Sequence, residues 1–370
     1  MSSVDRSRAP RLAGMSIVSA VAVDLTGFNA AMQRGERGIR DEMEGWPVAL
    51  IRDAFFRRDT DDDSLADMLN GVATAAFTDA GEDPALLREP TTALIISSTK
   101  GDIQGLATSE GETSLGPFAA RIGRRLGVRG HLELVSCACA SGGVALTRAL
   151  RILRGGWARR VLVLGFERLN RFLVKGFGSL GALSRSPARP FDRNRDGLTL
   201  GEGAAAILLE LDGRPGIRVT GAGQSCDATG MIRPAADGSG LILAMDRAIM
   251  EAGADRPVDA VCGHGTGTVA NDAMEAAAFI SRFDGRPPPV FGVKGATGHT
   301  MGCCGVTEAI VCALALTGGY IPGTTGFESG NEGLDVAAAT RDADMNRLLS
   351  VNAGFGGINI ALVIEKDLDG

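Results

Sequence analysis

The chain has 370 residues, of which 45% are hydrophobic and 22% are charged, a composition typical of a soluble globular protein and not of a disordered one. The net charge of −6 argues against nucleic-acid binding, because phosphate contacts need a surplus of basic residues. No uninterrupted apolar stretch reaches the roughly 20 residues that span a bilayer, and the polar start Met1–Ala9 carries no secretion signal. We therefore expect a cytoplasmic protein whose seven cysteines are reduced.

Predicted strands and helices alternate along the first half of the chain. Strands are expected at 12–24, 91–101, 132–137, 159–167 and 203–212, and helices at 25–42, 59–82 and 140–156. The strand–helix–strand order between 132 and 167 is typical of a parallel sheet, so we predict an α/β fold. The polar segment 182–197 is expected to be a surface loop.

The second half repeats this rhythm after the segment GRPG (213–216). Strands are expected at 217–223, 258–265, 289–295, 347–354 and 358–366, and helices at 239–253, 271–282 and 303–317. The similar order of elements suggests two similar halves, 1–213 and 214–370, although no identity repeat is visible. We expect the first half to carry a nucleophilic cysteine and the second to carry two functional histidines.

The segment VSCACASGG (135–143) places a cysteine where a buried strand ends and a helix begins. Amides at a helix N-terminus stabilise a thiolate, and small neighbours leave room for an acyl group and for oxyanion donors. We assign the nucleophile to Cys139, at the turn itself, and not to Cys137. Taken alone, the segment is better explained by two inert buried cysteines. A metal site is disfavoured, because no second cysteine pair has ligand spacing nearby.

Two of the three histidines stand in similar strand–turn–helix settings. His264 begins HGTGT (264–268), and His299 ends KGATGH (294–299), with Lys294 before it and Glu308 after it. A histidine near a helix N-terminus stays neutral and donates a hydrogen bond from one nitrogen. Each could be structural, but with Cys139 they form a coherent set. The thiolate would take an acyl group, and the imidazoles would hold a second substrate's thioester oxygen as carbon dioxide leaves.

The segment VNAGFGGINI (351–360) is expected to be a glycine-rich turn between two strands. Phe355 lies between glycines, so its ring could be a mobile gate beside an acyl site or a simple hydrophobic filler. The amide of Gly356 could serve an oxyanion hole. No helix follows this pattern, which argues against a dinucleotide site, and we expect neither a cofactor nor a metal.

Together these motifs resemble the elongating β-ketoacyl-[acyl-carrier-protein] synthases, condensing enzymes of the thiolase fold. The matching segments, in the family's order, are CACASG (137–142), PFDRNRDGLTLGEGAA (190–205), HGTGT (264–268), KGATGH (294–299) and GFGGIN (354–359). The resemblance implies a thiolase-like five-layered αβαβα fold of two similar halves, normally dimeric. The chain is shorter than typical members before the nucleophile (about 106–131) and at 184–190, which suggests a polyketide or aryl-polyene type of pathway.

The resemblance also implies roles for individual residues. Cys139 would carry the acyl group, and His264 and His299 would assist decarboxylation and condensation. Lys294 and Glu308 would support the second histidine. Phe355 would be the gate, and Phe177 would line the acyl pocket.

The implied reaction is a decarboxylative Claisen condensation between the enzyme-bound acyl group and malonyl-acyl carrier protein, in fatty acid or polyketide biosynthesis. The implied partners are acyl carrier protein, in its acyl and malonyl forms, and an identical or different ketosynthase subunit. No nucleic acid and no membrane are expected to take part.

Three alternative functions remain open from the sequence. The first is a non-catalytic, chain-length-shaping subunit of a heterodimeric ketosynthase, although such subunits usually lack the nucleophile. The second is acyl transfer or decarboxylation without bond formation, which would use the same residues. The third is a cysteine hydrolase, which needs a basic histidine beside the thiol and a route for water.

Overall fold

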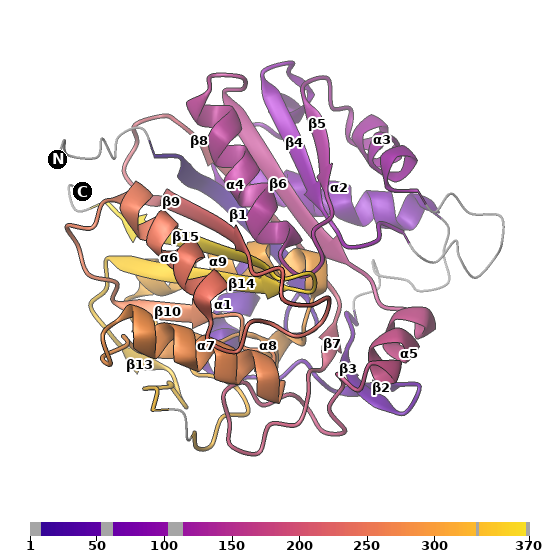
Figure 1. Cartoon of the computed structure of the whole chain (residues 1–370). Coiled ribbons are helices and arrows are strands. Elements are labelled where there is room, and N and C mark those ends of the chain that lie inside the picture. The colour runs from indigo at the N-terminus through magenta and orange to yellow at the C-terminus, as the bar shows by residue number, and fades with distance from the viewer. Residues whose placement is uncertain (1–8, 53–61, 103–113, 331–332, 368–370) are drawn as a thin grey trace.

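The computed structural model describes residues 9–52, 62–102, 114–330 and 333–367 (Figure 1). Within these residues, ten strands form one large sheet. The strands from the first half of the chain are β1 (Arg11–Ser19), β4 (Thr92–Ser97), β5 (Leu132–Val135), β6 (Arg160–Glu167) and β8 (Gly203–Glu210). Those from the second half are β9 (Ile217–Cys226), β10 (Ala260–Gly263), β11 (Val290–Gly292), β14 (Arg347–Gly354) and β15 (Ile358–Lys366).

The two halves of this sheet have the same strand order and directions. From the centre outward, the first half runs β1, β8, β6, β4, β5, with two antiparallel pairs followed by two parallel pairs. The second half runs β9, β15, β14, β10, β11, with the same succession of pairings. The expectation of two similar halves is therefore confirmed. The proposed boundary at 213/214 lies between β8 and β9 and stays a prediction.

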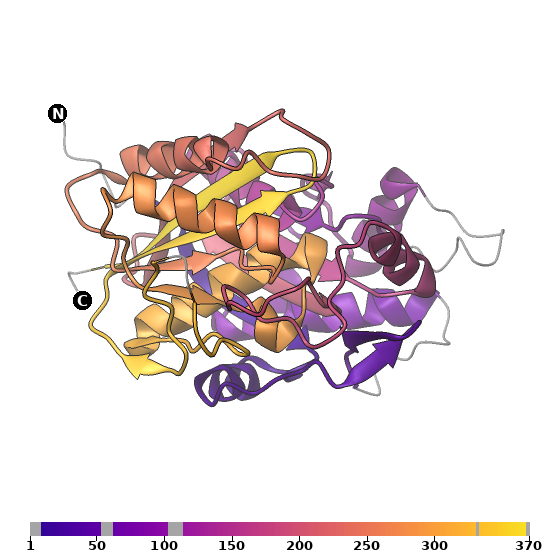
Figure 2. The ribbon, with the colours of Figure 1, turned by 60° about the horizontal axis from the view of Figure 1, so that its bottom comes forward.

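Helices cover both faces of each half of the sheet. The helices of the described residues are α1 (Leu25–Gln33), α2 (Asp62–Asp79), α3 (Leu115–Leu126), α4 (Ser141–Arg154), α5 (Arg171–Ser179), α6 (Ser239–Ala252), α7 (Val269–Arg282), α8 (Lys294–Thr297) and α9 (Cys304–Gly318). Helices α2 and α3 pack on the first half of the sheet, and α6 and α7 lie side by side on the second (Figures 1 and 2). Helices α4 and α9 contact strands of both halves. These layers form the five-layered αβαβα arrangement that the resemblance implied.

Some elements differ from the sequence-based expectation. The helix expected at 25–42 ends at Gln33, because Gly35 adopts a positive φ of 66°. The hairpin of β2 (Asp41–Met43) and β3 (Trp46–Ala49) follows, and β3 pairs with β7 (Leu200–Gly201). Helices α3 and α5 were not predicted, nor was the short pair β12 (Tyr320–Ile321) and β13 (Arg341–Asp342). Residues 59–61, the predicted start of the second helix, lie outside the described residues.

The first turns of α4 and α9 meet through their backbones. A Cβ atom at Gly142 would lie 2.8 Å from the amide nitrogen of Val306, and one at Gly305 would lie 2.5 Å from that of Gly143. Only glycine permits so close a helix crossing, because any side chain would collide with backbone. The crossing brings the segments that precede the two helices together, and these segments contain Cys139 and His299.

Helix α9 and the 3-10 turn before it, Met301–Gly318, are long and apolar enough by composition to cross a membrane. However, 83% of this stretch is buried inside the protein. It belongs to the middle layer and packs against strands from both halves of the sheet. Burial on all sides explains its apolar composition, so we interpret it as a core helix.

Candidate active site

Cys139 lies in the turn between β5 and α4, immediately before the helix N-cap Ala140. Ala138 has a positive φ of 48°, which residues other than glycine rarely adopt. The Ser141 hydroxyl holds the turn, since it donates to the carbonyl of Ala138 at 2.6 Å and accepts from the amide of Cys137 at 2.8 Å. Backbone strain of this kind is frequent at functional sites, where the surrounding structure holds a reactive group in place.

The Cys139 thiol is buried, with 5% of the residue exposed, and its Sγ lies 3.0 Å from Nε2 of His299. Burial raises the pKa of the Cys139 thiol to about 12, although the nearby ammonium groups of Lys294 and Lys100 act in the opposite direction. The expectation that the helix N-terminus lowers this pKa is therefore wrong for the resting protein, because removing a thiolate from water outweighs it. At rest the pair is a neutral thiol beside an imidazole.

His264 stands at the end of β10, in a turn held by the Glu275 carboxylate. Glu275 accepts from the backbone amides of His264 at 2.6 Å and Gly265 at 2.8 Å. The ammonium of Lys294 lies 3.1 Å from Nδ1 of His264. Because an ammonium only donates, Nδ1 is the acceptor and Nε2 carries the proton. Burial, then Lys294 and His299, lower the pKa of His264 well below its ordinary 6.5, so the ring stays neutral.

His299 lies between α8 and the turn that leads into α9. Its backbone amide donates to the carbonyl of Thr199 at 2.7 Å, and its ring stands edge-on to that of His264, with centroids 5.2 Å apart. Burial, followed by the charges of Lys294 and Lys100, lowers the pKa of His299 well below its ordinary value. Among the described residues, Nδ1 of His299 has no hydrogen-bond partner. Its tautomer is therefore free to change, whereas that of His264 is fixed.

Lys294 and Glu308 form a buried ion pair that serves the first histidine. The Lys294 ammonium donates to Nδ1 and the carbonyl oxygen of His264 and to Glu308, which also accepts from Asn352. Burial opposes the charge of Lys294, but the carboxylate of Glu308 raises the pKa of this ammonium overall. The resemblance placed the pair beside His299, whereas its direct contact is with His264. Its observed effect is to fix the tautomer of His264.

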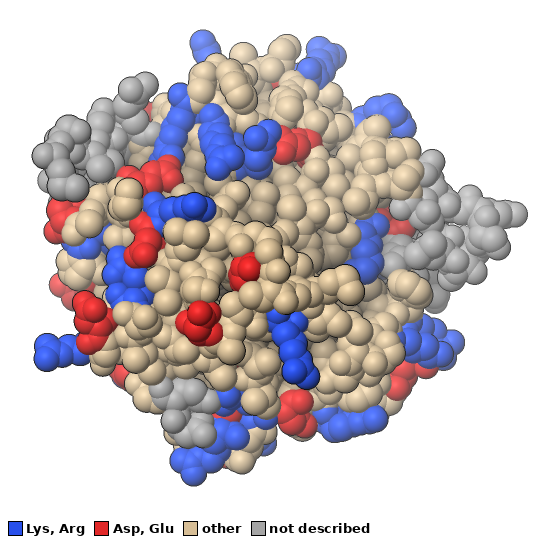
Figure 3. Space-filling view, viewed as in Figure 1, with Lys and Arg blue, Asp and Glu red and all other residues tan. Residues whose placement is uncertain are grey.

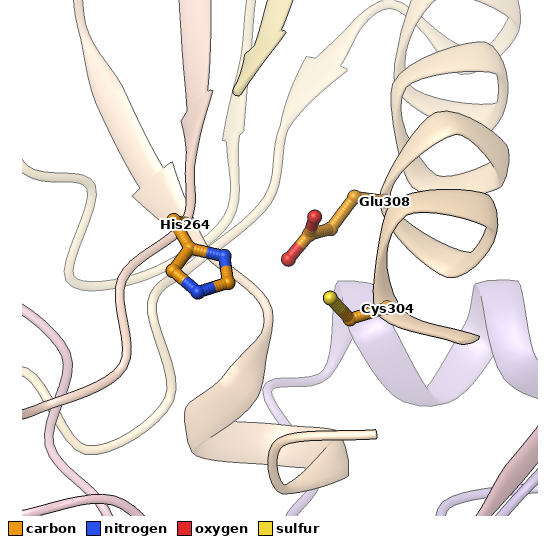
Figure 4. A group of neighbouring side chains, drawn as sticks. All are labelled: His264, Cys304 and Glu308. Atoms are coloured by element: carbon orange, nitrogen blue, oxygen red, sulfur yellow. The ribbon is translucent and has the colours of Figure 1, made fainter. Parts of the chain in front are cut away.

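His264, Cys304 and Glu308 bring potential metal ligands within 4.8 Å of one another (Figure 4). Figure 4 shows the imidazole facing the two side chains that α9 contributes. However, the Lys294 ammonium already donates to both His264 and Glu308. It would repel a second cation at the same place. We therefore interpret the group as the surroundings of the Lys294 ammonium and not as a metal site.

Cys304 and Asn352 were missed by sequence reasoning. The Cys304 thiol donates to the carbonyl oxygen of Cys139 at 3.2 Å, and burial raises its pKa well above the ordinary value. The pair Cys303–Cys304, directly after the His299 turn, was a signal that could have drawn attention to it. No comparable signal marked Asn352, whose contact with Glu308 depends on how β14 packs against α9.

Two cavities meet at Cys139. The first has a volume of about 340 Å³ and contains both imidazoles, His264 and His299. The second has a volume of about 480 Å³, contains neither imidazole, and is lined mainly by apolar side chains such as Phe172 and Met301. A site with two arms that share one thiol can hold two groups at once, one on each side of the sulfur.

Phe177 and Phe355 line both cavities, and their rings stack at 5.8 Å with an interplanar angle of 25°. Phe177 lies on α5, and Phe355 lies in the turn between β14 and β15. The amide of Gly356 donates to the carbonyl of Met231 at 2.8 Å. In this conformation it is therefore engaged and does not provide the expected oxyanion donor. The structure thus brings together Cys139, His264, His299, Lys294, Glu308 and the two phenylalanines.

Comparisons with known proteins agree with this arrangement. Two family models match, "Beta-ketoacyl synthase, N-terminal domain" over residues 48–212 and "Beta-ketoacyl synthase, C-terminal domain" over residues 217–328. The chain is 34% identical over 261 residues to 3-oxoacyl-[acyl-carrier-protein] synthase 2 of Vibrio harveyi, covering 65% of this chain and 63% of that protein. It is 26% identical to 3-oxoacyl-[acyl-carrier-protein] synthase 1 of Escherichia coli K12, covering 96% of this chain and 98% of that protein.

A solved structure, the ishigamide ketosynthase/chain length factor, matches with a TM-score of 0.87 and 27% identity, over 97% of this chain and 99% of that chain. A β-ketoacyl synthase from Burkholderia phymatum has the same fold, with a TM-score of 0.85 and 24% identity over 97% and 99% of the two chains. The two family models together span most of the sequence, and the matched residues include Cys139, His264 and His299. The chain belongs to the β-ketoacyl synthase family.

Proposed function

We propose that the chain is a β-ketoacyl-acyl carrier protein synthase that loads an acyl group on Cys139 and condenses it with malonyl-acyl carrier protein. One observation carries this proposal: the Cys139 sulfur lies where two cavities meet, 3.0 Å from Nε2 of His299. One of these cavities also contains His264, whose tautomer Lys294 fixes. A hydrolase needs one cavity and a water. Two substrate-sized arms on one thiol suit the joining of two acyl groups.

In the loading step, Sγ of Cys139 attacks the carbonyl carbon of the incoming thioester. The new carbon–sulfur bond forms to Cys139, and the bond to the carrier's thiol breaks. The proton of Cys139 moves to the departing thiol by way of Nε2 of His299, which lies within reach and has no fixed tautomer. Because burial raises the thiol pKa to about 12, we expect proton transfer to accompany the attack and not to precede it.

In the condensation step, the malonyl thioester occupies the cavity that contains both histidines. The N–H at Nε2 of His264 donates to the thioester oxygen, and the His299 ring supplies the second donor once Cys139 is acylated. The carboxylate leaves as carbon dioxide, and the resulting enolate carbon attacks the carbonyl carbon on Cys139. A carbon–carbon bond forms and the bond to Sγ breaks. The released thiolate takes up a proton from solvent, by way of Nε2 of His299 beside the sulfur.

The second cavity suits the acyl chain. Its lining residues Phe172, Leu173 and Met301 are apolar, and burying methylene groups against them stabilises the acyl-enzyme by about 0.8 kcal/mol per group. The stacked rings of Phe177 and Phe355 lie between this cavity and the histidines, so movement of Phe355 would control passage from one to the other. The wall of the second cavity also includes Lys100, whose charge would not stabilise a plain hydrocarbon chain.

The partners of this reaction would be the acyl and malonyl forms of an acyl carrier protein, in the cytoplasm. A second ketosynthase subunit is also proposed, since β5, one of the two outermost strands of the described sheet, offers a free edge for pairing. That subunit is either a second copy or a different chain, as in the matching ketosynthase/chain length factor structure.

A non-catalytic, chain-length-shaping role is the second candidate, favoured by the likeness to a ketosynthase/chain length factor structure. Release of carbon dioxide from malonyl carrier protein separates the two. We expect His264→Ala to acylate at Cys139 and to lose carbon dioxide release about a hundredfold, the usual effect of removing an oxyanion donor. A wild-type protein that releases no carbon dioxide while folded and acylated would support the non-catalytic role.

A further inference from the structure

The mouth of the cavity that contains both histidines carries a cation that the mechanism above does not use. Arg233 lines this cavity together with Ile232 and Pro234, in the loop between β9 and α6. Its side chain is exposed, and among the described residues it forms neither an ion pair nor a hydrogen bond. The surface around the turn between β14 and β15, which borders the mouth, is mostly uncharged (Figure 3).

Other cations in this region already have protein partners. Arg171 and Lys175 on α5 both pair with Glu44. The guanidinium of Arg185 lies over the ring of Trp46 at 3.6 Å. Arg233 differs from them because its five N–H donors face solvent at the entrance of the route to Cys139.

The proposed substrates have an anionic group that would stand at such an entrance. A carrier protein presents its thioester on a pantetheine arm, and a phosphodiester joins the outer end of the arm to the protein. Inside the cavity, the hydroxyls of Thr266 and Thr268 lie 2.9 Å apart and suit the amide groups of the arm. The phosphodiester then lies outside them, toward the mouth. Guanidinium groups bind phosphate oxygens through two parallel hydrogen bonds.

We propose that Arg233 binds the phosphodiester of the incoming arm and so selects phosphorylated donors over the same thioesters without phosphate. This inference rests on the proposed function, since it assigns a recognition residue to that reaction. Arg233 would act in binding and not in the chemical steps. Its contribution should therefore appear in the concentration dependence of acylation and fall as ionic strength rises, because the group is exposed.

The experiment compares three donors that carry the same acyl group: acyl-phosphopantetheine, acyl-pantetheine and acyl-carrier protein. The time course of acylation at Cys139 is followed by intact-protein mass spectrometry to obtain kcat/KM for each. We expect the wild type to prefer acyl-phosphopantetheine to acyl-pantetheine about tenfold, the scale of one charge-assisted hydrogen bond weakened by exposure. Arg233→Met should reduce this ratio to about one, and Arg233→Lys should keep part of it, since one charge remains.

Arg286→Met is the matched control, because Arg286 is also an exposed arginine but follows the opposite end of α7 from the cavity. It should keep the wild-type ratio. An unchanged ratio in Arg233→Met would overturn the proposal. So would slower acylation from the carrier protein with no change for free acyl-phosphopantetheine, which would indicate that Arg233 contacts the carrier's surface. Absence of acylation of the folded wild type by every donor would instead refute the proposed function, and this inference with it.

Discussion

Replacement of Lys294 by methionine tests whether the buried ion pair positions His264. Lys294→Met removes the donor to Nδ1 of His264 and leaves the carboxyl of Glu308 with Asn352 as its remaining partner. Breaking a buried pair costs about 3–5 kcal/mol of stability. Losing a charge-assisted hydrogen bond of about 1.5–3 kcal/mol should slow condensation about tenfold to a hundredfold. Single-turnover reaction of pre-acylated protein with malonyl carrier protein measures this rate without the loading step.

The double variant Lys294→Met/Glu308→Gln separates stability from positioning. It replaces the pair by neutral groups of similar size, so urea unfolding should return to within about 1–2 kcal/mol of the wild type. Condensation should stay slow, because Nδ1 of His264 still lacks its donor. If condensation recovered together with stability, Lys294 would be only a structural residue, and the fixed tautomer of His264 would have no part in the reaction.

Three further predictions follow from the same site. His299→Ala should stop condensation of pre-acylated protein and slow loading more mildly, as separate single-turnover rates would reveal; equal losses in both would contradict the assigned roles. Since both buried rings have lowered pKa values, the unfolded chain takes up protons below pH 6.5 that the native protein does not. The free energy of unfolding should therefore fall below pH 6.5, by up to about 1.4 kcal/mol per pH unit for each ring, and less steeply in His299→Gln. Gly142→Ala should lower the free energy of unfolding by about 1–3 kcal/mol, because its Cβ would meet the backbone of α9. The control Gly71→Ala, in an open position on α2, should not lower it.

Much of the arrangement was predictable from local sequence patterns. Cys139 and His264 each follow a strand and lie beside a run of small residues, and that local pattern is enough to mark them. The small residues after His299 mark it as well, although the short helix α8, and not the expected strand, comes directly before it. The equal strand order of the two halves was suggested by the succession of predicted elements. Helix α3 was not predicted, because its short amphipathic face, with Phe118 and Ile122, follows a stretch without a clear period.

The rest depends on contacts between distant segments. Lys294 meets His264 and not its sequence neighbour His299, because β11, which leads to Lys294, pairs in parallel with β10, which leads to His264. The thiol of Cys139 has a raised pKa because both halves of the sheet bury it, which a local helix-terminus argument could not include. The amide of Gly356 donates to the carbonyl of Met231, which lies more than a hundred positions earlier in the chain, so no local pattern could indicate this contact. The position of Arg233 at the mouth of the cavity likewise depends on the fold, which brings its loop beside the segments that carry Cys139 and the histidines.

The most direct test of the central claim is the mass of the intact protein after mixing with acyl carrier proteins of different chain type, and again after adding malonyl carrier protein. We predict a mass gain equal to the acyl group, absent in Cys139→Ala, and its loss on addition of malonyl carrier protein, with a β-ketoacyl product. A folded wild-type protein that gains no mass from any donor, or a Cys139→Ala variant that still forms the product, would contradict the account.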